Sequence, residues 1–166
     1  MMQTAHSALP LGLTGPDFGL VKGSNMTDGL FKNIGYVKSQ DTTVGPITPG
    51  QNRRKAFEAG TLCMGECHVT ALDAPSQWHH HAEYDSVMYM LSGRIRVDYG
   101  ANGEKSFEIG KGDYAFFPRR AIHRCQIVEG GDDVHYIFVR VGEGETVVNV
   151  DGPGAFAAVP REIQKA

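Results

Sequence analysis

Residues 94–109 read RIRVDYGANGEKSFEI and combine two strand patterns with a turn between them. Polar and apolar side chains alternate from Arg94 to Tyr99 with a period of two, which is typical of a strand that buries one face. Asn102-Gly103 follows as a hairpin-turn dipeptide, and residues 107–109 supply a second short strand. The stretch therefore predicts an antiparallel hairpin.

Short strands and turns continue on both sides of this hairpin. We predict strands at residues 53–59, 62–72, 87–91, 113–117, 123–128, 134–141 and 146–150. Strands that recur about every ten residues indicate an all-β sandwich or barrel. The 21 glycines among 166 residues agree with this, because glycine favours turns and destabilises helices.

Residues 1–45 differ from the rest of the chain. Seven glycines fall here without a period, and the apolar residues are scattered. We predict a Gly-rich N-terminal arm over 1–45, extended or partly disordered, with a short helix considered at 27–34. The remaining residues, 46–166, form the predicted barrel domain.

Charge and composition argue against nucleic acid and membranes as binding partners. The formal net charge is -3, so no basic excess indicates nucleic acid or an acidic membrane surface. No apolar run approaches the roughly 20 residues of a membrane span, and the N-terminus lacks the pattern of a signal peptide. Cys63, Cys67 and Cys125 are an odd number with no zinc-ribbon spacing. We therefore predict free thiols and a cytoplasmic location.

Candidate metal ligands are concentrated in residues 78–86, WHHHAEYDS. On a strand, His79 and His81 point to the same face and His80 to the other. His123 lies at the start of another predicted strand. Three imidazoles that converge inside a barrel would hold a divalent transition metal and leave positions open for substrate. The alternative is a solvated turn that happens to carry histidines.

The order of these residues resembles the cupin superfamily. The first motif of that family, His-x-His followed by a glutamate and then a glycine, matches His79, His81 and Gly93. The second motif matches Gly112 to His123, read GDYAFFPRRAIH. The resemblance covers about residues 45–153 and implies a cupin-type double-stranded β-helix, that is, a jelly-roll barrel, with an irregular N-terminal extension. It also implies a homodimer.

A finer resemblance concerns the Trp-His-His-His run, Trp78 to His81. This run is similar to that of a group of single-domain bacterial cupins.

Three positions depart from the family pattern. Ser86 stands where the family has its glutamate, Arg120 where the second motif has a glycine, and Ile127 where that motif ends in asparagine. We expect the turn at Arg120 to differ in backbone geometry, because glycine often serves a positive φ.

The missing glutamate leaves three possible metal shells. Glu83 continues the alternation of His79 and His81 and would share their face on an unbroken strand. Asp85 keeps the family spacing but requires a bulge before Gly93. The favoured interpretation is a site of three histidines, with both acids as ordinary exposed charges.

Three further residues are candidates for substrate binding. Met88 faces inward if Ser86 does, and Cys125 shares the inward face of His123. Trp78 either closes the mouth of the pocket or covers the barrel. Plain core packing is the alternative for Met88 and Cys125.

The resemblance implies a metal-binding cupin that acts on a small organic molecule in its barrel. The favoured chemistry is Fe(II)-dependent dioxygenation, hence an oxidoreductase, with one divalent transition metal ion per chain. Zinc, nickel or manganese as a Lewis acid would indicate an isomerase or lyase, which needs a base such as Glu83 or Tyr84. A non-enzymatic binding or sensing cupin is the third hypothesis.

Overall fold

The computed structural model describes residues 34–70, 75–128 and 133–158, and most of these are in β-strands. One short 3-10 helix, η1 (Ser39–Asp41), is the helical element of these residues. Most of the predicted arm and of the helix considered at 27–34 lies outside the described residues. Within the described residues, no helix is long and apolar enough to span a membrane.

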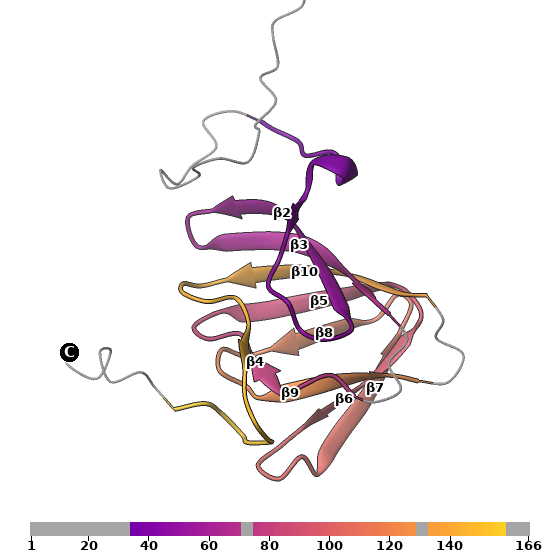
Figure 1. Ribbon diagram of the computed structural model, residues 1–166, viewed down its shortest axis with the longest axis vertical. Coiled ribbons are helices and arrows are strands. Elements are labelled where there is room, and N and C mark those ends of the chain that lie inside the picture. Colours follow the sequence, from indigo (N-terminus) through magenta and orange to yellow (C-terminus); the bar gives the residue numbers. More distant parts are fainter. Residues whose placement is uncertain (1–33, 71–74, 129–132, 159–166) are drawn as a thin grey trace, which may run out of the picture.

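Two antiparallel sheets make up the fold. The first has the strand order β1-β2-β3-β10-β5-β8, and Figure 1 shows β2, β3, β10, β5 and β8 side by side. Its strands are β1 (Thr43–Val44), β2 (Gln51–Ala59), β3 (Leu62–Val69), β10 (Val134–Val141), β5 (Asp85–Ser92) and β8 (Tyr114–Phe117).

The second sheet has the strand order β11-β4-β9-β6-β7. Its strands are β11 (Val148–Asn149), β4 (His79–His80), β9 (His123–Ile127), β6 (Arg94–Tyr99) and β7 (Lys105–Gly110). The predicted hairpin is confirmed as β6 and β7, with Ile95 opposite Ile109. The all-β jelly-roll barrel predicted from the sequence is confirmed.

Side-chain alternation places the core between the two sheets. Along β10 every second residue is buried, and the same holds for Ser86, Met88 and Met90 on β5. Ile95 and Val97 face them from β6 with no exposed surface. Burial of these side chains supplies the main driving force for closing the barrel.

Two short strands lie outside the predicted strand ranges, although the interpretation of the histidine run already placed His79 on a strand. β1 pairs with β2, with Thr43 opposite Lys55, so the first sheet begins at residue 43. β4 contains two residues and lies between β11 and β9. Strands of two residues are too short to show a period in the sequence, and only their pairing partners define them.

Two turns near the second sheet use a left-handed backbone without glycine. Ala82 has a φ of 44° and Arg120 a φ of 60°. The expectation of a different backbone at Arg120 is therefore wrong, because the turn keeps the positive φ that a glycine would adopt. A side chain in this region stores local strain of about 1 kcal/mol.

Candidate metal centre

Three buried imidazoles converge at one end of the second sheet. His79 on β4 lies directly opposite His123 on β9, and His81 follows just after β4. The potential ligand atoms of the three residues all lie within 4.8 Å of one another. The pairing of β4 with β9 therefore brings together the three histidines that the sequence singled out.

Backbone carbonyls fix the orientation of each ring. His79 Nδ1 lies 3.0 Å from the carbonyl of Gln77, His81 Nδ1 2.9 Å from that of Thr146, and His123 Nδ1 3.0 Å from that of Ala121. A carbonyl oxygen only accepts, so each Nδ1 carries the hydrogen and donates it. Each Nε2 is left with its lone pair available to a metal, which is how ligating histidines are usually held.

Burial keeps these rings neutral. It lowers the pKa of His123 to about 4 and is the main cause of the lowered pKa values of His79 and His81. Positive groups nearby act in the same direction, with Arg140 the largest of them at His81. A neutral imidazole is the form that binds a metal, so the site is ready to do so at neutral pH.

His80 differs from its neighbours in position and in tautomer. The N–H of Ala82 donates to His80 Nδ1 over 3.0 Å, so this ring carries its hydrogen on Nε2 when neutral. His80 pairs with Val148 of β11 and does not belong to the cluster of His79, His81 and His123. The two faces predicted for the histidine run are thus observed.

The structure places Glu83 and Asp85 outside the histidine cluster. β4 ends at His80 and the chain turns at Ala82, so the alternation that would have put Glu83 beside His81 is broken. The Glu83 carboxylate lies 3.5 Å from Arg120 Nε. Asp85 accepts from the backbone N–H and the guanidinium of Arg119, which lowers its pKa.

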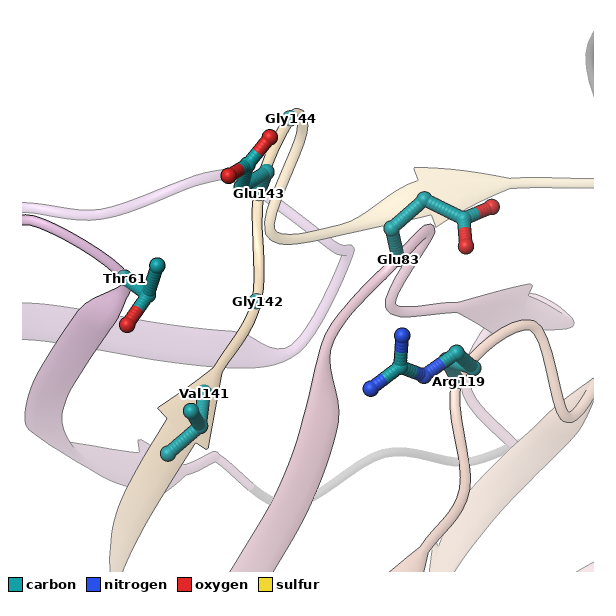
Figure 2. A pocket seen from close by; sticks show the side chains of 7 residues that line it. All are labelled: Thr61, Glu83, Arg119, Val141, Gly142, Glu143 and Gly144. Atoms are coloured by element: carbon teal, nitrogen blue, oxygen red, sulfur yellow. The ribbon is translucent and has the colours of Figure 1, made fainter. Parts of the chain in front are cut away.

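Glu83 and Arg119 instead border a surface pocket of about 520 Å³. Figure 2 shows these two side chains on one side of the pocket, with Thr61 and Val141 on the other. None of the three converging histidines lines this pocket. It is therefore separate from the histidine cluster.

Ser86, at the position of the family's glutamate, is buried and faces the barrel interior. Its hydroxyl accepts a hydrogen bond of 3.4 Å from Arg140 Nε. Ser86 is also paired with Phe117 of β8, whose ring stacks on His123 with a centroid distance of 4.3 Å. Arg140, Ser86 and Phe117 thus form one row that reaches the histidine cluster.

Two buried arginines were missed by the sequence reasoning. Arg140 and Arg53 are 2% and 3% exposed, and neither forms an ion pair within the described residues. Arg53 donates to Thr48, Gln51 and the carbonyl of Pro46. The signal for both is the alternation along β2 and β10, which places each arginine in the same row as the buried residues of its strand.

The three predicted substrate-binding residues have different surroundings. Met88 and Cys125 are buried in the core cluster, and burial raises the pKa of the Cys125 thiol to about 12. Trp78 is half-buried, with Arg124 over its ring at 4.7 Å and Gly103 beside it. All three cysteines are free thiols and are buried.

A second cluster of potential metal ligands lies on the outer face of the first sheet. Glu66 and His68 on β3 and His135 on β10 bring their ligand atoms within 4.8 Å of one another. His135 Nε2 is 3.1 Å from Glu66, and the rings of His68 and His135 stack at 3.8 Å. The sequence shows Glu66 and His68 two apart, but only the strand pairing brings His135 to them.

Comparison with known proteins agrees with this geometry. The family model described as the cupin domain matches residues 65–140, which include all three converging histidines. Comparison with curated proteins gives no match.

Solved structures with this fold have low sequence identity to the chain. Hydroxypropylphosphonic acid epoxidase from S. wedmorenis has a TM-score of 0.56 at 12% identity, covering 64% of this chain and 58% of that one. Oxalate decarboxylase from Lactobacillus farciminis has a TM-score of 0.55 at 15% identity, covering 67% and 34%. The chain thus spans less than two thirds of either protein.

A third structure is closer in length. An uncharacterized conserved protein with a double-stranded β-helix domain from Klebsiella pneumoniae has a TM-score of 0.53 at 15% identity, covering 65% of this chain and 85% of that one. The barrel, the motif positions and the family match agree, and residues 65–140 form a cupin domain.

Proposed function

We propose that the protein is a metal-dependent enzyme that acts on a small organic molecule at a three-histidine centre. The observation that carries the proposal is the convergence of His79, His81 and His123 with each Nδ1 bonded to a carbonyl. The favoured reaction is Fe(II)-dependent dioxygenation. A bound iron would supply redox chemistry with dioxygen and open positions for substrate.

The donor set fits a divalent first-row transition metal. Three neutral imidazole nitrogens suit iron, nickel, zinc or copper, and no carboxylate of the described residues joins the cluster. Solved structures with this fold include one described as FeII HppE and a Bacillus subtilis oxalate decarboxylase with Mn(II) centres. These neighbours support a divalent metal at the site, and the choice of iron is part of our proposal.

The chain's own residues bear on the choice between the two kinds of chemistry. Met88, Met90 and Phe117 are buried on the inner face of the first sheet, and the apolar ring of Phe117 stacks directly on His123. Lewis-acid isomerisation or elimination would also need a positioned base. Glu83 is paired with Arg120 outside the cluster, and burial raises the pKa of Tyr84. This favours dioxygenation over the isomerase or lyase alternative.

Metal analysis tests the proposed centre. Full-length protein loaded anaerobically with Fe(II) and desalted should retain about one ion per chain, and His79→Ala should retain none at this site. The second cluster needs its own control, because Glu66, His68 and His135 are also potential ligands. A His135→Ala variant should keep the iron. Equal metal content in wild type and His79→Ala would contradict the proposal.

Oxygen uptake tests the reaction. The iron-loaded protein should consume oxygen with at least one member of a panel of diketones, catechols and thiols, whereas His79→Ala should not. Metal binding without oxygen uptake across the panel, together with turnover by the zinc, nickel or manganese form, would favour the isomerase or lyase. Ligand binding without turnover by any form would favour the binding or sensing cupin.

The homodimer, the cytoplasmic location and the relation to the Trp-His-His-His group stay predictions. Tyr114 and Phe116 on the edge strand β8 are 72% and 61% exposed, which is the kind of surface that a second subunit could cover.

A further inference from the structure

Arg140 is a buried cation with an N–H group that has no hydrogen-bond partner in the part of the chain that the structure describes. Its side chain is 2% exposed, and its Nη1 is buried without a hydrogen-bond partner among the described residues. The one side-chain hydrogen bond that it makes there runs from Nε to Ser86. Leaving a buried N–H unpaired costs about 1–3 kcal/mol, and more for a charged group.

The strand register places this cation beside the histidine cluster. Arg140 on β10 is opposite Ser86 on β5, and Ser86 is opposite Phe117 on β8. The Phe117 ring stacks on His123 and meets His81 edge-on at a centroid distance of 6.2 Å. The guanidinium also lies 4.2 Å from the centroid of the Phe138 ring, which supports its flat face from the same strand.

The balance of charge around this cluster is positive. Arg53 is the second buried arginine, and its Nε is also buried without a partner, as is Nε2 of the adjacent Gln51. The ion pairs of the described residues involve other arginines, for example Arg96 and Arg124 with Asp98. A divalent ion on three neutral histidines would add two more positive charges.

Arg140 remains a cation at neutral pH. Burial and the neighbouring Arg53 lower its pKa to about 10, which still leaves the guanidinium protonated. Buried charges in proteins are normally paired, and an unpaired one beside a ligand site calls for a ligand of opposite sign. The guanidinium is also the side chain whose geometry best matches carboxylate and phosphonate oxygens.

We propose that Arg140 binds an oxyanion group of the substrate through its free Nη1, so that the barrel accepts small organic acids, carboxylates or phosphonates. That the bound oxyanion would lie beside a metal rests on the proposed function. The unpartnered N–H of Arg140 is independent of it. Phe117 and Met88 then contact the apolar part of the acid, and Arg53 adds positive potential from β2.

Thermal denaturation of the full-length protein tests this inference. The protein is titrated with acetate, oxalate or methylphosphonate at constant ionic strength, and with acetamide as the neutral isostere of acetate. At least one anion should raise the melting temperature by about 3 °C once it exceeds its Kd tenfold, and acetamide should not. An equal response to acetate and acetamide, or no response to any anion, would overturn the proposal.

Variants locate the binding group. Arg140→Met should weaken anion binding about tenfold or more. Arg140→Lys should weaken it less, because lysine keeps the positive charge but lacks the paired N–H donors of the guanidinium. Arg94→Met is the matched control, since Arg94 is exposed and pairs with Glu108 at 3.6 Å. A folded Arg140→Met with the wild-type response would refute the assignment. The comparison of acetate with acetamide uses the wild-type protein, so it still tests the proposal if Arg140→Met does not fold.

His79→Ala separates this inference from the proposed function. If Arg140 binds the anion, the response persists in this variant, which lacks the metal. A response that is seen only in metal-loaded wild type would assign the anion to the metal and overturn the role of Arg140. If the wild-type protein binds no metal but still responds to the anion, the metal centre is refuted and the role of Arg140 is supported.

Discussion

Arg140 and Ser86 occupy paired positions on β10 and β5, with the guanidinium Nε 3.4 Å from the serine hydroxyl. Ser86 is the position at which the cupin pattern has a glutamate. In this chain the residue at that position is a small serine with a cation paired to it on the next strand, and Nη1 of that cation has no hydrogen-bond partner among the described residues. This pair distinguishes the interior of this barrel from a centre with three histidines and one glutamate.

Ser86→Glu should abolish the anion response. The new carboxylate would lie within reach of Arg140 and accept from its unpartnered Nη1, so acetate or oxalate would no longer raise the melting temperature. Ser86→Gln has nearly the same shape without the charge and should retain part of the response. Thermal titration of both variants checks this, and an unchanged response in Ser86→Glu would contradict the pairing.

The metal-free protein should lose stability in mild acid. The folded-state pKa of His123 is about 4, below its ordinary value of 6.5, so the unfolded chain binds more protons between these pH values. Its contribution is complete above pH 6.5 and falls by about 3 kcal/mol as the pH drops to 4. Urea denaturation across this range measures the slope, and the same titration of His123→Asn should give a shallower one.

Gly65→Ala should destabilise the barrel strongly. A Cβ at this position would lie 2.1 Å from the carbonyl oxygen of Arg54 and 2.7 Å from the Phe138 ring. We expect a loss of at least about 2 kcal/mol and a weaker anion response, because Phe138 supports Arg140. Gly152→Ala is the control, since nothing lies within 4 Å of its Cβ, and it should stay within about 0.5 kcal/mol of wild type.

Arg120→Gly should be more stable than Arg120→Ala by about 1 kcal/mol. The φ of 60° at this position strains any residue with a Cβ, and glycine relieves that strain. Both variants lose the ion pair with Glu83, so the comparison isolates the backbone. Equal free energies of unfolding for the two variants would show that the turn carries no such strain.

The sequence predicted the long strands well, because their alternation and turns are local signals. β6 was predicted with its observed bounds, and β10 likewise. The histidine cluster was predicted from the spacing of His79 and His81 together with the family motif around His123. By contrast, the two-residue strands β1 and β4 depend on their pairing partners and have no signal of their own.

The positions of charged residues were harder to predict. Glu83 follows the alternation of the histidines, but the left-handed turn at Ala82 breaks the strand before it. The sequence does not single out Arg53 or Arg140 as core residues, because arginines are rarely buried without a carboxylate. The burial pattern along β2 and β10 shows that both side chains share the alternating positions that enter the core.

The carbonyl-anchored rings of His79, His81 and His123 have a calorimetric consequence. At neutral pH all three are already neutral, with the hydrogen on Nδ1 and the lone pair on Nε2. A metal entering this site displaces no protons, in contrast to sites whose ligands must first ionise. The heat of metal binding at pH 7 will therefore be the same in phosphate-free buffers of very different ionisation enthalpy.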